Sequence, residues 1–79
     1  MDVKEDIRKF IAEEIMFEPG ASIADGQPLL GDILDSLGLM QVVEFIEDHY
    51  EVSVPDEDVV PENFENLPAL ERYVTSLKG

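Results

Sequence analysis

The sequence predicts an all-α protein, a small four-helix bundle with three main helices, one short helix and a long structured loop between the first and second helices. Three observations lead to this fold. Apolar residues recur three and four positions apart in three separate segments, as on one face of a helix. The one strand-like stretch has no pairing partner in the chain. Finally, 79 residues of 44% hydrophobic composition suffice for one core, so we expect residues 1–79 to form a single domain.

The first helix is expected to run from residue 2 to about residue 16 or 17. Asp2 and Glu5 fit the capping pattern that opens a helix, and Glu18-Pro19-Gly20 ends it. The apolar face of this helix consists of Val3, Ile7, Phe10, Ile11 and Ile15. The connection that follows, residues 18–35, contains enough apolar residues to pack onto the helices. These are Ile23, Leu29, Leu30, Ile33 and Leu34.

The second helix is expected from Asp35-Ser36 to Tyr50. It should lie centrally, because its apolar residues cover a wide arc of the helix. The remaining stripe starts with an exposed leucine and is then polar and mostly acidic. Its members are Leu37, Gln41, Glu44, Asp48 and Glu51, with Glu47 at its edge.

Beyond the second helix, Val52-Ser53-Val54-Pro55 is expected to be extended and to lead into a short helix over residues 56–59, which Pro61 ends. The last helix is expected from about residue 66 to about residue 77. The hydroxyls of Tyr50 and Tyr73 should require hydrogen-bond partners or access to water. The predicted core contains Ile7, Phe10, Ile11, Ile15, Met40, Val43, Ile46, Tyr50, Val54, Leu70, Tyr73 and Val74.

Charge is the strongest global signal. Nineteen acidic residues face five basic ones, which gives a formal net charge of −14 at pH 7. Such a field repels nucleic acids and anionic membrane surfaces and attracts proteins with basic patches. The N-terminus lacks the apolar run of a signal peptide, and no segment approaches the length of a membrane span. We therefore expect a cytoplasmic monomer that neither binds nucleic acid nor inserts into membranes.

The chain lacks the residues for catalysis of its own. It has no cysteine, a single histidine, His49, and no glycine-rich phosphate loop. The calcium-loop pattern also fails, because Asp25-Gly26 and the pair Asp32 and Asp35 have the wrong spacing. We therefore expect neither an enzyme nor a metal site. An acidic adaptor that binds a basic partner without being modified shares all these global features.

Ser36 is the residue with the clearest local chemistry. A serine at a helix N-terminus can act as an N-cap, its hydroxyl accepting a backbone N–H. Alternatively, the free amides and the helix dipole favour a phosphate esterified to that oxygen. The local pattern alone favours the N-cap, because serine is preferred at that position. The two interpretations are compatible, since a capping serine can also be modified.

A family resemblance favours the second interpretation. The segment Gly31-Asp32-Ile33-Leu34-Asp35-Ser36-Leu37-Gly38-Leu39-Met40-Gln41-Val42-Val43-Glu44-Phe45-Ile46-Glu47 resembles the signature region of acyl carrier proteins and peptidyl carrier domains. The resemblance extends over nearly the whole chain. It includes the long first loop, the acidic second helix, Val-Pro-Asp at the short helix and the closing amphipathic helix.

This resemblance implies a carrier with a 4'-phosphopantetheine arm, transferred from coenzyme A onto Ser36 by a phosphopantetheinyl transferase. The arm would hold acyl or aminoacyl groups as thioesters, which a ligase or transferase loads and downstream synthases use. Asp35 would help to position the transferase and its metal, and Leu37 would dock partners. The residues expected to contact basic partner enzymes are Gln41, Glu44, Glu47, Asp48, Glu51, Asp56 and Glu57.

Two positions depart from the commonest pattern of this family. Gly38 stands where fatty-acid carriers usually have an acidic residue, and Glu44 stands where they often have an exposed methionine. Both differences favour a freestanding carrier of a specialised pathway. A housekeeping carrier of fatty-acid synthesis is the alternative, as is the unmodified adaptor.

Overall fold

The structure, a computed structural model, describes residues 3–78, so the expected cap at Asp2 lies outside the described residues. Within this range the protein is helical and has no strand, which confirms the predicted all-α bundle. Its elements are α1 (Val3–Phe10), a π-helical turn η1 (Ile11–Ile15), α2 (Ser36–Tyr50), a 3-10 turn η2 (Asp56–Asp58), α3 (Pro61–Phe64) and α4 (Leu67–Lys78).

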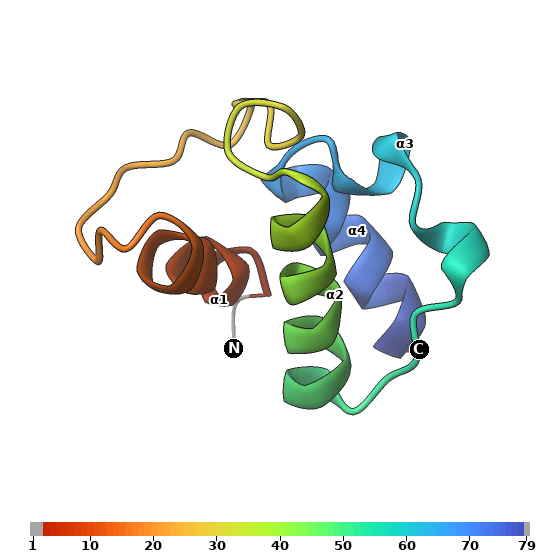
Figure 1. Cartoon of the computed structure of the whole chain (residues 1–79). Helices are drawn as coiled ribbons and strands as arrows, with labels where there is room; N and C mark the ends of the chain where they lie inside the picture. Colours follow the sequence, from red (N-terminus) through yellow and green to blue (C-terminus); the bar gives the residue numbers. More distant parts are fainter. Residues whose placement is uncertain (1–2, 79) are drawn as a thin grey trace.

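The central element is α2, as the sequence predicts. In Figure 1 it stands between α1 on one side and α4 on the other, while the long loop passes over the end at which α2 begins. Since α1 also packs against α4, the three main helices enclose one core. In the described range, no helix combines the length and the apolar character that spanning a bilayer requires.

The region between α2 and α4 differs from the prediction at Pro61. Instead of ending a helix, Pro61 is the first residue of α3, a four-residue helix preceded by the extended Val60. Proline suits this position because its fixed φ matches the helix and its missing N–H would have no partner there. The expected short helix at residues 56–59 is the 3-10 turn η2. The fold therefore has two short helical segments here, where the sequence suggested one.

The core confirms seven of the predicted residues as buried: Ile7, Ile11, Val43, Ile46, Val54, Leu70 and Val74. Four others are only half-buried: Phe10, Ile15, Tyr50 and Tyr73. Met40 was wrongly placed in the core, since it is 50% exposed. The apolar arc of α2 is wider than the surface its neighbours cover, and Met40 lies outside the covered part. Phe64, fully buried in α3, was missed because so short a helix has no periodicity to show.

The long loop packs onto the helices as predicted, with Ile23, Leu29 and Leu34 buried in the core. Several backbone hydrogen bonds hold its second half; among them, Leu29 N–H donates to Glu65 O, and Leu34 N–H donates to Leu29 O. These contacts fix the segment that leads directly into α2.

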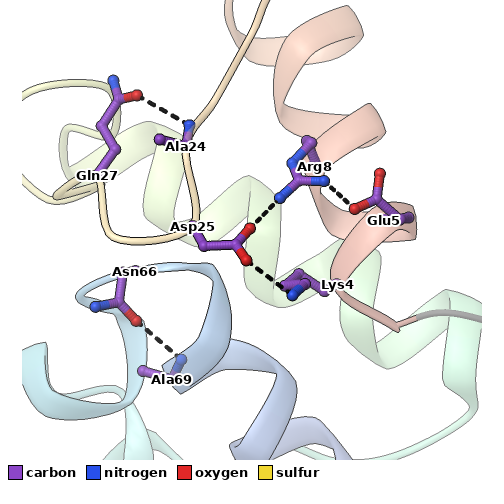
Figure 2. A network of polar contacts seen from close by, with 8 residues as sticks. All are labelled: Lys4, Glu5, Arg8, Ala24, Asp25, Gln27, Asn66 and Ala69. Carbon is purple, nitrogen blue, oxygen red and sulfur yellow. Dashed lines mark hydrogen bonds and ion pairs between the residues drawn. The ribbon is translucent and has the colours of Figure 1, made fainter.

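Ion pairs of Asp25 connect the first half of the loop to α1. Its carboxylate accepts hydrogen bonds from Lys4 and from Arg8, which also contacts Glu5 (Figure 2). The hydrogen bond from Lys4, together with the positive charges of Lys4 and Arg8, holds the pKa of the Asp25 carboxyl below its usual 3.8. Asp25 is therefore ionised throughout the neutral range, so its ion pairs with Lys4 and Arg8 persist there.

Both tyrosine hydroxyls have the partners that the sequence analysis required. Tyr50 donates to Asp6 Oδ2 at 2.9 Å, which links the end of α2 to α1. Tyr73 donates to Asp58 Oδ2 at 2.7 Å, which links α4 to η2. Partial burial and the neighbouring Asp58 carboxylate raise the pKa of Tyr73 above its ordinary value, so its hydroxyl remains the donor.

The corrected core makes a direct prediction about stability. Phe64→Ala should cost about 3–5 kcal/mol, because it removes a fully buried ring from a small core. Met40→Ala should cost less than about 1 kcal/mol, because the side chain is half in solvent. Urea unfolding of both variants measures the difference. Equal losses would show that the two side chains are buried to a similar extent.

Candidate functional site

Ser36 is the first residue of α2 and is exposed. The cap of this helix is the preceding residue: Asp35 has extended backbone, and its Oδ1 accepts a hydrogen bond from Gly38 N at 2.7 Å. The suggestion that Ser36 caps the helix is therefore wrong. Within residues 3–78 the Ser36 hydroxyl has no hydrogen-bond partner, so it is not committed to holding the helix together.

The electrostatic surroundings of Ser36 favour a phosphate. The first N–H groups of a helix have no partner inside it, and the aligned peptide dipoles concentrate positive partial charge there. In α2, fifteen residues long, Ser36 stands at this positive end. A phosphodiester on its Oγ would meet the dipole that stabilises anions at helix N-termini.

Gly38 lies close to its neighbours at the start of α2. A Cβ at this position would lie 3.3 Å from Asp35 Oδ1, 3.4 Å from Leu34 Cδ2 and 3.7 Å from Ile15 Cγ2. A Cβ would therefore be tight only against the capping carboxylate of Asp35, which would have to shift by a few tenths of an ångström, while its contacts with Leu34 and Ile15 would be ordinary. Glycine thus leaves the Asp35 cap undisturbed at a position where the resembling fatty-acid carriers usually have an acidic residue.

Exposed apolar side chains surround Ser36. Leu37 is 69% exposed, in line with its expected position, and Phe17 is 81% exposed. Both line a hollow of about 320 Å³ beside Ser36, which Ile15 and Ile33 also line. An apolar surface next to a reactive hydroxyl can hold a ligand or dock a partner.

Phe17 was missed by the sequence analysis, which considered it only as the end of the first helix. It follows Met16, the C-terminal cap of η1, and has φ 57°, a left-handed conformation that glycine more often adopts at this position. The π-helical hydrogen bond from Met16 N to Ile11 O precedes it. One signal was available in the sequence: a large apolar residue stands directly before the helix-ending Glu18-Pro19-Gly20.

The structure brings together only some of the acidic recognition residues. Gln41, Glu44 and Asp48 are exposed on α2 and line a common hollow of about 530 Å³. Glu47 is half-buried, and its Oε2 accepts a hydrogen bond from Val54 N at 2.9 Å, so it anchors the segment that follows α2. Glu51 is exposed and caps the end of α2.

The remaining two expected recognition residues, Asp56 and Glu57, are exposed on η2. In Figure 1, η2 and α1 lie on opposite sides of α2. The acidic residues therefore do not form one continuous ridge.

Comparison with known proteins decides the class. Residues 5–74 match the family described as "Phosphopantetheine attachment site". The chain belongs to this family of carrier proteins. It is also 23% identical to a D-alanyl carrier protein of Streptococcus mutans serotype c (strain ATCC 700610 / UA159), over all of this chain and 99% of the relative. The prosthetic group of this carrier is thus 4'-phosphopantetheine, and other enzymes perform the chemistry.

A solved structure agrees with the carrier fold. The chain superimposes with a TM-score of 0.74 on a chain of the structure described as "Crystal structure of FAD-dependent dehydrogenase". The two chains are 32% identical, and the match covers 86% of this carrier and 97% of the other chain. Carriers of the phosphopantetheine family work with phosphopantetheinyl transferases, loading enzymes and downstream enzymes.

The cap geometry of the carrier makes a prediction that separates Asp35 from Ser36. Asp35→Ala should destabilise the protein by about 0.5–2 kcal/mol through loss of the cap, whereas Asp35→Asn should retain most of the stability. Ser36→Ala should change the stability by no more than about 0.5 kcal/mol. Urea unfolding of the unmodified proteins measures all three variants. A larger loss for Ser36→Ala than for Asp35→Ala would contradict the assignment of the cap.

Proposed function

We propose that this carrier holds acyl or aminoacyl groups as thioesters on a 4'-phosphopantetheine arm attached to Ser36, and presents them to the enzymes of a biosynthetic pathway. The observation that carries the proposal is the exposed Ser36 hydroxyl at the positive end of α2, which has no hydrogen-bond partner among residues 3–78. We further infer that residues 1–79 act as a single carrier domain, which the one hydrophobic core supports.

The other serines fit an attached phosphate less well. Ser76 lies near the C-terminus of α4, where the helix dipole disfavours an anion, and its hydroxyl donates to Tyr73 O at 2.8 Å. Ser22 and Ser53 are exposed, but they lie in irregular segments outside any helix. Among the serines, only Ser36 combines exposure with a helix N-terminus.

The residues around Ser36 suit an acceptor that depends on a partner for catalysis. The carrier's one imidazole, on His49, lies thirteen residues along α2, which is about 20 Å at 1.5 Å per residue. A transferase must therefore supply the base that removes the Ser36 proton. Asp35 uses Oδ1 for the cap, and we infer that its exposed carboxylate also contacts the transferase and its metal. The bound arm supplies a thiol, which this cysteine-free chain lacks.

For partner docking we propose Leu37 together with the exposed polar residues of α2. Leu37 offers an apolar contact next to Ser36, and Gln41, Glu44 and Asp48 offer a polar and acidic one. Such charges act chiefly on association rate and specificity. Of the remaining expected contacts, Glu51, Asp56 and Glu57 are exposed and available, whereas Glu47 contributes mainly through its bond to Val54.

A freestanding carrier of a specialised pathway remains our preferred function. The likeness to a D-alanyl carrier protein supports it over a housekeeping fatty-acid carrier, and the family assignment supports any carrier over an unmodified adaptor. We also propose that the carrier is a cytoplasmic monomer, because carriers of this family typically work in that compartment. Its net charge of −14 supports a monomer by disfavouring self-association, and it also disfavours nucleic acids as partners.

Modification of Ser36 can be tested directly. Incubation with coenzyme A and a promiscuous phosphopantetheinyl transferase should add one phosphopantetheinyl group to the native chain, as measured by intact mass. Ser36→Ala should abolish the mass gain, and Ser53→Ala, the matched exposed serine, should leave it unchanged. A gain that persists in Ser36→Ala would assign the arm to another residue.

The 32% identical chain suggests one class of downstream enzyme. Since 86% of this carrier is about 68 residues, and these cover 97% of the other chain, that chain has about 70 residues. This length suits one small domain, not a doubly wound dinucleotide-binding fold with its six parallel strands. We infer that a flavin-dependent dehydrogenase oxidises cargo held on this carrier, with a hydride passing to the flavin and a proton to a base of the enzyme.

Anaerobic mixing tests this partner class. The cargo-loaded carrier should bleach the flavin absorbance of a purified FAD-dependent dehydrogenase from the same cell, and the carrier with an empty arm should not. Glu44→Gln and Asp48→Asn together should slow the bleaching severalfold, because they weaken electrostatically steered association. Equally fast bleaching by the same cargo on free pantetheine would show that the carrier is not recognised.

A further inference from the structure

Three hollows that share lining residues lie one after another between the first helical segment and α2, beginning beside Ser36. The hollow beside Ser36, about 320 Å³, shares Glu14 and Gln41 with the hollow of about 530 Å³. The latter shares Phe10 and Phe45 with a third hollow of about 360 Å³. The three hollows adjoin one another at these shared residues, and together we call them the α1–α2 groove.

Aromatic rings line the middle of this groove. Phe10 of α1 stacks on Phe45 of α2 with ring centroids 4.4 Å apart. His49 stacks on Phe45 in turn, at 4.9 Å. Because Phe10 and His49 both stack on Phe45, these rings cover its faces, and the cluster offers the groove apolar surface.

Carboxylates border the aromatic rings. Glu14 of η1 and Glu44 and Asp48 of α2 are exposed and line the same hollow as Phe10 and Phe45. Their charges add to a protein whose net charge is already −14. At the end of the groove farthest from Ser36, Lys9 also lines the surface, together with further acidic side chains. The middle of the groove therefore favours a cation and repels an anion.

The length of the groove matches that of the prosthetic arm. From Leu37, beside Ser36, to His49 is twelve residues of α2, or about 18 Å at 1.5 Å per residue. A peptide-like chain advances about 1.1 Å per bond when extended, so the roughly 14 bonds from the Ser36 oxygen to the pantetheine sulfur span about 16 Å. An arm lying along the groove would bring its thioester to the aromatic and acidic section.

We propose that the α1–α2 groove holds the arm between visits to partner enzymes, and that it selects aminoacyl cargo through the cargo's ammonium group. The arm would start between Phe17 and Leu37 and run toward Phe45. The ammonium would meet Glu14, Glu44 and Asp48 beside the aromatic rings. This proposal rests on the proposed attachment at Ser36 and extends it by naming the cargo class.

Other cargo suits the groove less well. A carboxylate would be repelled by the bordering acids, and a long alkyl chain would lie in an open, partly polar surface where much of its apolar area stays in water. An aminoacyl cargo with a short or medium side chain can place that side chain against the rings and its free amino group near the carboxylates. The groove thus points to an aminoacyl carrier.

The test compares two stable arms that differ only in charge. A promiscuous transferase attaches pantetheine carrying alanine, or isobutyrate as its neutral isostere, through an amide in place of the thioester. Intact mass of the native chain and of Ser36→Ala first establishes attachment at Ser36, so a failure at this step counts against the proposed function alone. Proton NMR then measures nuclear Overhauser contacts from the cargo methyls to the Phe45 ring, and the amide shifts of residues 41–49.

We expect contacts to Phe45 for the alanyl arm, with intensities per methyl group at least about twofold above those of the isobutyryl arm. Glu14→Gln with Glu44→Gln should lower the alanyl contacts about two- to tenfold, as for two exposed ion pairs. The control Glu62→Gln with Glu65→Gln, which changes the same charge at exposed positions of the α3 region, should leave them unchanged. Equal contacts for the two arms would overturn the selection of aminoacyl cargo. If neither arm contacts Phe45, the groove is not the resting site of the arm. The groove would then be a binding surface for a basic element of a partner protein.

Discussion

The hydrogen bond from the Gly38 amide to the Asp35 carboxylate fixes where α2 begins, and the site depends on that point. With Asp35 as the cap, Ser36 becomes the first helical residue, whose side chain is free of any structural duty within the described chain. The buried Leu34 anchors the approach to the helix, and the small Gly38 leaves the Asp35 cap undisturbed. The reactive hydroxyl is thus held at the positive end of the central helix and kept in solvent.

The acidic residues that stabilise the fold differ from those that are exposed for contact with partners. Asp6, Asp58 and Glu47 each bind a hydroxyl or an amide of the fold, and Asp25 clips the loop to α1. Glu44 and Asp48, by contrast, line an open groove with no such bond among the described residues. The acidity of the chain thus serves both the fold and an interaction surface, and the two sets of residues are distinct.

Periodicity was enough to predict the main helices, the packed loop and the exposed Leu37, whereas the cap suggested at Ser36 lies at Asp35. Sequence patterns failed where tertiary contacts decide the outcome. Met40 has an apolar side chain on an apolar arc, yet no element covers it. Phe64 belongs to a helix too short to show a pattern, and Pro61 suits either the end or the start of a helix. The groove is formed by Phe10 and Glu14 meeting α2, a relation that no local spacing expresses.

The most direct test of the account is to locate the arm on the carrier isolated from its own cell. Cleavage at lysine and arginine yields the peptide of residues 10–72, which contains Ser22, Ser36 and Ser53. Fragmentation in the mass spectrometer should assign phosphopantetheine to Ser36, with cargo that carries a free amino group. An arm on Ser22 or Ser53, or a peptide that is never modified in the cell, would contradict the account.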